Sequence, residues 1–161
     1  MGKTVIIGGV AAGASAAARL RRLKENEEII LFERGEYISY ANCGLPYHVG
    51  NVIENRSDLL VTKKEMMESR YAIDVRINSE VTSINRDSKS VHVVTKDGQE
   101  YDESYDNLVI ATGSSPVRPA ISGIDSPKVK TLWTVPDTDE IKKYIKENSV
   151  KSATVLLFTV E

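Results

Sequence analysis

Residues 5–23, VIIGGVAAGASAAARLRRL, decide the fold class of this 161-residue chain. The β-branched run over residues 3–7 stops at Gly8, which predicts a short buried parallel strand. Alanine, leucine and arginine dominate residues 11–24 and predict a helix. The run EEIILFERG, residues 27–35, predicts a second buried strand. Strand, glycine turn, helix and strand within about 30 residues predict a βαβ unit.

The middle of the chain mixes helix and strand signals. Thr62 and Glu65 have the spacing of a capping box, which predicts a helix that ends near Arg70. The dipeptide Asp97-Gly98 predicts a hairpin turn. Three segments with strand patterns are IDVRI (73–77), EVTSINR (80–86) and SVHVVTK (90–96).

The last third alternates strand, loop and helix signals. Residues 105–116, YDNLVIATGSSP, predict a buried strand that ends at Thr112 and Gly113. Residues 137–140 predict the cap of a helix, and SATVLLF, residues 152–158, predicts one more buried strand.

Composition and charge narrow the classes of partner. A net charge of −2 without a long basic run gives no indication of nucleic-acid binding. A single cysteine excludes an internal disulfide and fits a reducing compartment. The N-terminus loosely imitates a secretory signal, but three glycines interrupt an apolar stretch shorter than the roughly 20 residues that span a bilayer. We therefore expect a cytoplasmic protein with no membrane partner.

The glycines of the first unit resemble a dinucleotide fingerprint. Gly8 and Gly13 occupy the first and third glycine positions, whereas Val10 replaces the second. Glu33 follows the second strand, where a carboxylate hydrogen-bonds an adenosine ribose. These features together predict a site for a nucleotide pyrophosphate at the helix N-terminus. The alternative is an ordinary βα turn with an incidental glutamate.

A polar stripe follows on the predicted helix. Ser15, Arg19 and Arg22 lie at i, i+4 and i+7, on one face. Guanidinium groups suit phosphate recognition, so this stripe is a candidate site for a second phosphorylated ligand. Spacing alone favours a solvated helix face. A neighbouring face is expected to pack against the sheet, formed by Ala16, Leu20 and Leu23.

Cys43 lies in the stretch ISYANCGLPYHVG, residues 38–50. A helix beginning near Gly44, with Asn42 as its cap, would place the thiol where the helix dipole stabilises a thiolate. A buried structural cysteine is the equally weighted alternative. Metal binding is not expected, because His48 and His92 stand alone and no second cysteine exists.

Three motifs in this order resemble the pyridine nucleotide–disulfide oxidoreductases: residues 5–23, SYANCGLPYHVG (39–50) and YDNLVIATGSSP (105–116). The single-cysteine branch, with coenzyme A-disulfide reductases and related NADH oxidases, is the most similar. The resemblance implies an α/β fold, an FAD/NAD(P)-binding Rossmann-like three-layer sandwich of parallel sheet, helices and small antiparallel β-meander. It also implies that residues 1–125 are the N-terminal part of the FAD-binding domain. Residues 126–161 would be a connecting helix and the first strand of a truncated NAD(P)H-binding domain.

The resemblance assigns roles to individual residues. Cys43 matches the redox-active nucleophile. The FAD contacts match Gly8, Gly9, Val10, Ala11, Ala12, Gly13, Glu33, Arg34, Val81, Ala111, Thr112 and Gly113. The coenzyme A contacts match Ser15, Arg19, Arg22, Ser39, Asn42 and, more weakly because the family often has lysine there, Tyr71.

The same resemblance implies a mechanism. Two-cysteine relatives use an internal disulfide, but position 48 here is a histidine, so Cys43 would form a mixed disulfide with coenzyme A. Electrons from NAD(P)H would reach it through FAD. The NAD(P)H site and the dimerisation domain of the homodimeric relatives have no counterpart in the chain, so we expect a fold incomplete at its C-terminus and a chain inactive alone. An NADH oxidase or polysulfide reductase-like fragment, and a non-catalytic relic of a truncated gene, are the alternatives.

Overall fold

A computed structural model describes residues 2–156 of the chain. Its centre is a parallel sheet of four strands in the order β3-β2-β1-β7. The first two strands form the predicted βαβ unit, with Val5 of β1 opposite Ile30 of β2. The strands are β1 (Lys3–Ile7), β2 (Glu28–Phe32), β3 (Asp74–Arg76) and β7 (Asn107–Ile110).

Two helices cover one face of this sheet, α1 (Ala12–Leu23) and α3 (Lys64–Tyr71). Ile6 and Leu31 point from the sheet into this layer and are buried with the small residues of α1 and with Met67 of α3. A parallel strand buried on both faces needs apolar side chains at successive positions, as the run over residues 3–7 has.

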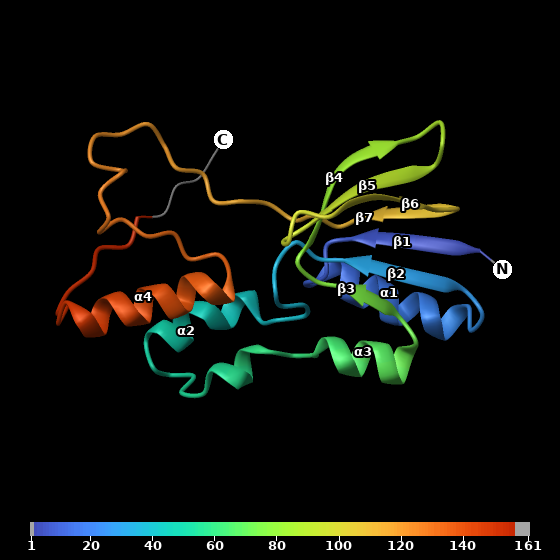
Figure 1. Ribbon diagram of the computed structural model, residues 1–161. Helices are drawn as coiled ribbons and strands as arrows, with labels where there is room; N and C mark the ends of the chain where they lie inside the picture. The colour runs from blue at the N-terminus through green and yellow to red at the C-terminus, as the bar shows by residue number, and fades with distance from the viewer. Residues whose placement is uncertain (1, 157–161) are drawn as a thin grey trace.

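The other face of the sheet lies under an antiparallel meander of β4 (Ser79–Asn85), β5 (Ser90–Thr95) and β6 (Glu100–Ser104). Here the alternate strand residues Val5 and Phe32 pack with Val91 and Val93 of β5, all buried. Helices, parallel sheet and meander form three layers (Figure 1). The predicted sandwich and the hairpin at Gly98, which has φ +83°, are confirmed.

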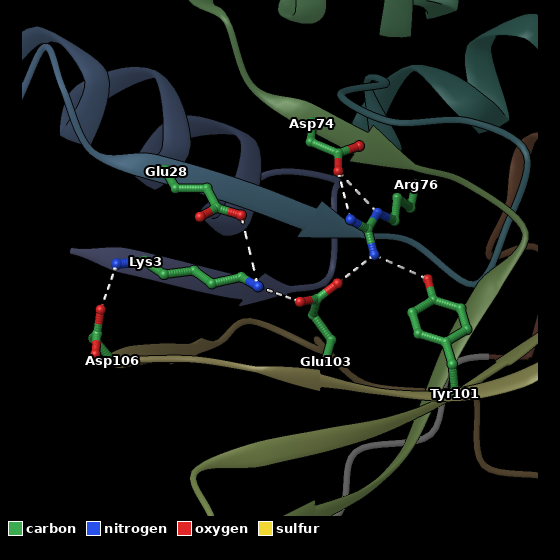
Figure 2. A network of polar contacts seen from close by, with 7 residues as sticks. All are labelled: Lys3, Glu28, Asp74, Arg76, Tyr101, Glu103 and Asp106. Carbon is green, nitrogen blue, oxygen red and sulfur yellow. Dashed lines mark hydrogen bonds and ion pairs between the residues drawn. The ribbon is translucent and has the colours of Figure 1, made fainter. Parts of the chain in front are cut away.

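Figure 2 shows the polar network that ties the meander to the sheet. Glu103 of β6 contacts Lys3 of β1 and accepts a hydrogen bond of 2.6 Å from Nη1 of Arg76. Arg76 also contacts Asp74 and the Tyr101 hydroxyl group. Burial alone would raise the pKa of Glu103, but its hydrogen bonds from Lys3 and Arg76 prevail and lower it.

A second region lies beside the sheet, where α2 and α4 pack side by side (Figure 1). Its core consists of Leu45, Leu59 and Val135, all buried. The region consists of the 3-10 turns η1 (Asn42–Gly44) and η2 (Arg56–Leu59) and the helices α2 (Leu45–Val49) and α4 (Val135–Glu147). Long-range packing stabilises the shorter elements, since a helix of five residues such as α2 is not stable alone.

Two predicted helix caps are wrong. The helix predicted after Thr62 begins later, and its N-cap Lys63 makes no side-chain cap. The backbone N–H of Thr62 is instead bonded to the carbonyl group of Ser39, which holds this segment against another turn. The C-terminal helix begins at Val135, before the predicted cap over residues 137–140. Thr134 caps it reciprocally with Asp137.

Two predicted strands differ from the structure. The strand expected to end at Thr112 and Gly113 ends at Ile110. Its partner β1 ends at Ile7, and the last bond between them runs from the N–H of Ala111 to the carbonyl oxygen of Ile7. Residues 152–156 of the predicted SATVLLF strand form no strand, and Val155 is 80% exposed. No neighbouring strand lies alongside residues 152–156 within the described part of the chain, and residues 157 and 158 lie outside it.

The face of α1 that contacts the sheet is the predicted one only in part. Leu20 packs against the core between α1 and the sheet as expected, but the buried residues of the helix are Gly13, Ala14 and Ala17, and Leu23 is 64% exposed. The smallest side chains face β1 because they let the helix approach the sheet closely. Among the helices of residues 2–156, none has the length and apolar character that crossing a membrane requires.

Candidate functional site

The glycine loop between β1 and α1 is closed too tightly for side chains. Gly8 has φ +100°, and a Cβ atom there would lie 2.2 Å from the carbonyl oxygen of Ala111. A Cβ atom on Gly13 would lie 1.7 Å from the carbonyl oxygen of Gly8. The backbone of the loop therefore approaches both β7 and α1, as the predicted pyrophosphate turn requires.

The N-terminus of α1 has the chemistry of an anion site. The helix begins after Ala11 without a side-chain cap and without an acidic residue in its first turn. The first N–H groups of a helix have no partner within it and carry partial positive charge. Ala11 and Ala12 are exposed and Val10 is half-buried, so small side chains border these donors. The segment fits a pyrophosphate group.

Glu33 lies at the end of β2 and faces this loop. Its carboxylate accepts hydrogen bonds of 2.8 Å from the backbone N–H groups of Gly9 and Gly35. Each carboxylate oxygen has two lone pairs, so both can still accept a ribose hydroxyl group. The sequence did not predict the bond from Gly35 to Glu33, because Gly35 belongs to no recognisable motif. Arg34, the residue between Glu33 and Gly35 in sequence, is exposed.

The two other predicted nucleotide segments lie next to this carboxylate and this loop. The backbone N–H of Ser79 donates to the carbonyl oxygen of Glu33 at 3.0 Å. Val81 follows Ser79 by two residues on the same strand and is half-buried. Ala111 follows β7 beside Gly8, and the exposed Thr112 and Gly113 continue from it. The structure thus brings the predicted loop, acid and second turn to one edge of the sheet.

Tyr40 is a further residue near the acid that the sequence analysis missed. Burial raises the pKa of Tyr40, and the negative charge of Glu33 adds to this effect. Its neighbour Ser39 has φ +46° and donates its backbone N–H to the carbonyl oxygen of Gly9 at 2.9 Å. The stretch that leads to Cys43 therefore begins in contact with the glycine loop.

Cys43 is exposed, which rules out the alternative of a buried structural cysteine. It lies in η1, directly before α2, and Pro46 is in the first turn of α2 as predicted. The predicted cap is wrong: Ala41 is the N-cap of η1, and Asn42 lies inside the turn as an exposed residue. The thiol is accessible to a reactant from solvent.

The predicted phosphate stripe lies on the exposed face of α1. Ser15, Arg19 and Arg22 are all exposed, and neither arginine side chain has a hydrogen bond or ion pair within residues 2–156. Arg21, between them in sequence, instead donates from Nε to the carbonyl oxygen of Tyr71 at 2.7 Å. Tyr71 is half-buried at the end of α3.

The structure brings together only part of the predicted site. Ser39 contacts the glycine loop, but in residues 2–156 no hydrogen bond or ion pair joins Cys43 to Ser15, Arg19 or Arg22. For the described ranges, no three His, Cys, Asp or Glu side chains are grouped to hold a metal ion.

Comparison with known proteins decides the family. The profile of the family described as pyridine nucleotide-disulphide oxidoreductase matches residues 2–156. The chain belongs to this family. Its members are FAD-dependent oxidoreductases that also bind NAD(P)H, and the three-layer α/β fold described above is consistent with theirs.

Curated members of the pyridine nucleotide-disulphide oxidoreductase family that resemble the chain are coenzyme A disulfide reductases. The protein of Staphylococcus haemolyticus (strain JCSC1435) is 37% identical over 97% of the chain, and that of Staphylococcus aureus (strain JH9) is 39% identical over the same share. In both, the match covers 35% of the relative. The chain therefore spans about a third of the length of these relatives.

Solved structures of the family give the same picture. The reduced CoADR-RHD of Bacillus anthracis superimposes with a TM-score of 0.89 at 51% identity, covering 92% of this chain and 27% of that one. The NAD-dependent persulfide reductase from A. fulgidus has a TM-score of 0.85 at 36% identity, covering 90% of this chain and 28% of that one. The water-forming NADH oxidase from Lactobacillus brevis has a TM-score of 0.85 at 28% identity, covering 91% of this chain and 33% of that one.

Proposed function

We propose that this chain supplies the redox-active thiol and part of the FAD-binding site of a coenzyme A-disulfide reductase. The observation that carries the proposal is the exposed Cys43, the sole cysteine, on a segment that contacts the glycine loop through Ser39. Similarity to proteins named coenzyme A disulfide reductase supports the choice of substrate.

The residues at the sheet edge fit FAD. The uncapped N-terminus of α1 would bind its pyrophosphate, and Glu33 would accept hydrogen bonds from its adenosine ribose. When bound, FAD would supply a route for two electrons from NAD(P)H. The proposed contacts are Gly8, Gly9, Val10, Ala11, Ala12, Gly13, Glu33, Arg34, Val81, Ala111, Thr112 and Gly113.

Cys43 is proposed as the nucleophile. Its thiolate attacks one sulfur of coenzyme A disulfide, so that an S–S bond forms to Cys43 and the other coenzyme A leaves as a thiolate. Two electrons and one proton then break this mixed disulfide, which restores the Cys43 thiolate and releases the second coenzyme A as a thiol. An exposed thiol next to a turn backbone is accessible to a substrate of this size.

The stripe on α1 is proposed to bind the phosphates of coenzyme A. The guanidinium groups of Arg19 and Arg22 are exposed and have no acidic partner in the described chain, so they are available to an external anion. Ser15, Ser39, Asn42 and Tyr71 complete the proposed contacts. A persulfide reductase or NADH oxidase activity is the second candidate, because relatives with those names share the fold at TM-scores of 0.85.

Mass spectrometry of the protein after incubation with coenzyme A disulfide tests this function. We expect one coenzyme A adduct, absent in Cys43→Ser, and slower adduct formation in the double variant Arg19→Ala/Arg22→Ala. Arg86→Ala is the matched control, because it removes an exposed guanidinium group from the β4–β5 hairpin, beyond the proposed site. An adduct that persists in Cys43→Ser, or equal slowing by Arg86→Ala, would contradict the assignment.

A further inference from the structure

The turn that bears Cys43 is supported from a distant part of the chain. The α2 helix that follows the thiol has five residues, so packing must determine its position. Leu45 at its start is buried against Val135 at the start of α4, together with Leu59 of η2. This core is separate from the two that border the parallel sheet.

Lys142 of α4 fixes the far end of α2. Its Nζ atom donates to the carbonyl oxygen of His48 at 2.9 Å and to Oδ1 of Asn51 at 2.8 Å. A cation at the C-terminal end of a helix satisfies carbonyl groups that have no partner within the helix. One side chain of α4 therefore binds both the last turn of α2 and the loop after it.

Asp139, three residues earlier on α4, binds η2, which contributes Leu59 to the same core. Its carboxylate accepts a bidentate pair from Arg56, with Nε at 2.8 Å and Nη2 at 2.7 Å. The guanidinium carbon of Arg56 lies 4.8 Å from the centre of the Tyr37 ring, and Nη2 also donates to the Tyr37 hydroxyl group. Planar bidentate pairs restrict orientation as well as distance.

The backbone on either side of the thiol is bound to these elements. Ala41 donates its N–H to the carbonyl oxygen of Leu59 at 2.8 Å, and Gly44 donates to that of Ala41 at 2.9 Å. A Cβ atom on Gly44 would lie 3.1 Å from Cδ2 of Leu59 and 3.3 Å from Cδ1 of Ile53. A shift of α2 or η2 would therefore move the backbone of Cys43.

We propose that Lys142 and Asp139 are positioning residues for Cys43, which hold its turn in one orientation toward a large disulfide substrate. The inference rests on the proposed role of Cys43 as the nucleophile. It predicts that changes on α4 alter how Cys43 discriminates between substrates. A purely structural role of α4 would alter only the stability of the fold.

The test compares two rates of mixed-disulfide formation at Cys43, one with coenzyme A disulfide and one with the small neutral 2-hydroxyethyl disulfide. We expect Lys142→Met to lower the ratio of the first rate to the second about tenfold, since small misplacements of reacting groups have effects of at least this size. Lys142→Arg keeps the donors and should restore most of the ratio. Lys143→Met is the matched control, because Lys143 is 71% exposed and pairs only with Glu147 among the described contacts.

Each outcome is decisive. An unchanged ratio in folded Lys142→Met would overturn the positioning role, and so would an equal fall in Lys143→Met. If Lys142→Met does not fold, Asp139→Asn, which keeps the size of the side chain, decides in the same way. A wild-type protein that forms no coenzyme A adduct, yet reacts with the small disulfide, would overturn the proposed function and this inference with it.

Discussion

The glycine-loop region and the Cys43 region of this molecule are built in different ways. The loop, α1 and Glu33 are close in sequence, and backbone constraints at Gly8 and Gly13 fix their geometry. The elements that flank the Cys43 turn are held by contacts between residues far apart in sequence, Arg56 with Asp139 (83 residues apart) and His48 with Lys142 (94 residues apart). The glycine loop is thus formed by residues close in sequence, whereas the support of the Cys43 turn depends on the tertiary fold.

The largest effect is expected in the glycine-loop region. Gly13→Ala would gain about 1 kcal/mol of helix propensity, but its Cβ atom would overlap the carbonyl oxygen of Gly8. The backbone must shift, and we expect the free energy of unfolding to fall by about 3 kcal/mol. Urea denaturation measures this. Gly50→Ala is the control, because its nearest contact would be an ordinary 3.5 Å; equal losses in both variants would refute the steric argument.

A smaller loss is expected in the Cys43 region. Val135 is fully buried between α2 and η2, so Val135→Ala leaves a cavity and should lower the free energy of unfolding by about 2 kcal/mol. Val52→Ala removes the same atoms from a residue that is 74% exposed and should change little. The labelling rate of Cys43 by iodoacetamide should change in Val135→Ala alone. An unaltered rate there would mean that the α4 core does not hold the thiol.

The network of Figure 2 should give a loss that depends on pH. The pKa of Glu103 is lowered in the folded protein, so its stabilising effect is present above the unfolded pKa and is lost as the pH falls through the folded pKa. At neutral pH we expect Glu103→Gln to lower the free energy of unfolding by about 1 kcal/mol, a loss between those typical of exposed and of buried ion pairs. Glu28→Gln, whose exposed carboxylate also contacts Lys3, is the control. A wild-type acid transition retained in Glu103→Gln would contradict this assignment.

The smallest effect is expected at the outer face of the meander. A hydrogen bond to Asp102 raises the pKa of the half-buried His92. The contribution of this bond to stability is therefore present below the unfolded pKa and is lost as the pH rises through the folded pKa. An NMR titration should show the pKa of His92 fall in Asp102→Asn. Asp87→Asn removes a charge elsewhere on the meander and should leave that pKa unchanged. If both variants lower it equally, overall charge rather than this hydrogen bond is the cause.

The sequence predicted the conformation of the glycine-loop region well because its signals are steric and local. Backbone geometry fixes the positions of Gly8, Gly13 and Glu33, and the apolar residues over 3–7 are removed from water only by burial on both faces of the sheet. The packing face of α1 was predicted only in part: Leu20 packs as expected, but the exposed Leu23 shows that large apolar side chains are a weaker guide than the need for a close approach at Gly13.

The Cys43 region could be predicted only in part. The turn and Pro46 were evident, but neither Arg56 nor Lys142 differs in sequence from an ordinary exposed cation. Their partners are a carboxylate, a carbonyl group and an amide that become neighbours only in the folded chain. Thr62 shows the opposite error: its local capping signal is overridden, because its backbone N–H donates to the carbonyl oxygen of Ser39.

Equilibrium dialysis of the folded protein against FAD tests the central claim most directly. We expect one FAD per chain, with affinity lowered about tenfold in Glu33→Gln, since a hydrogen bond to a charged group contributes about 1.5 kcal/mol. Cys43→Ser, on the separately supported region, should leave the affinity unchanged. A folded protein that binds no FAD, or that binds it equally well in Glu33→Gln, would contradict the assignment of the glycine loop and Glu33 as its cofactor site.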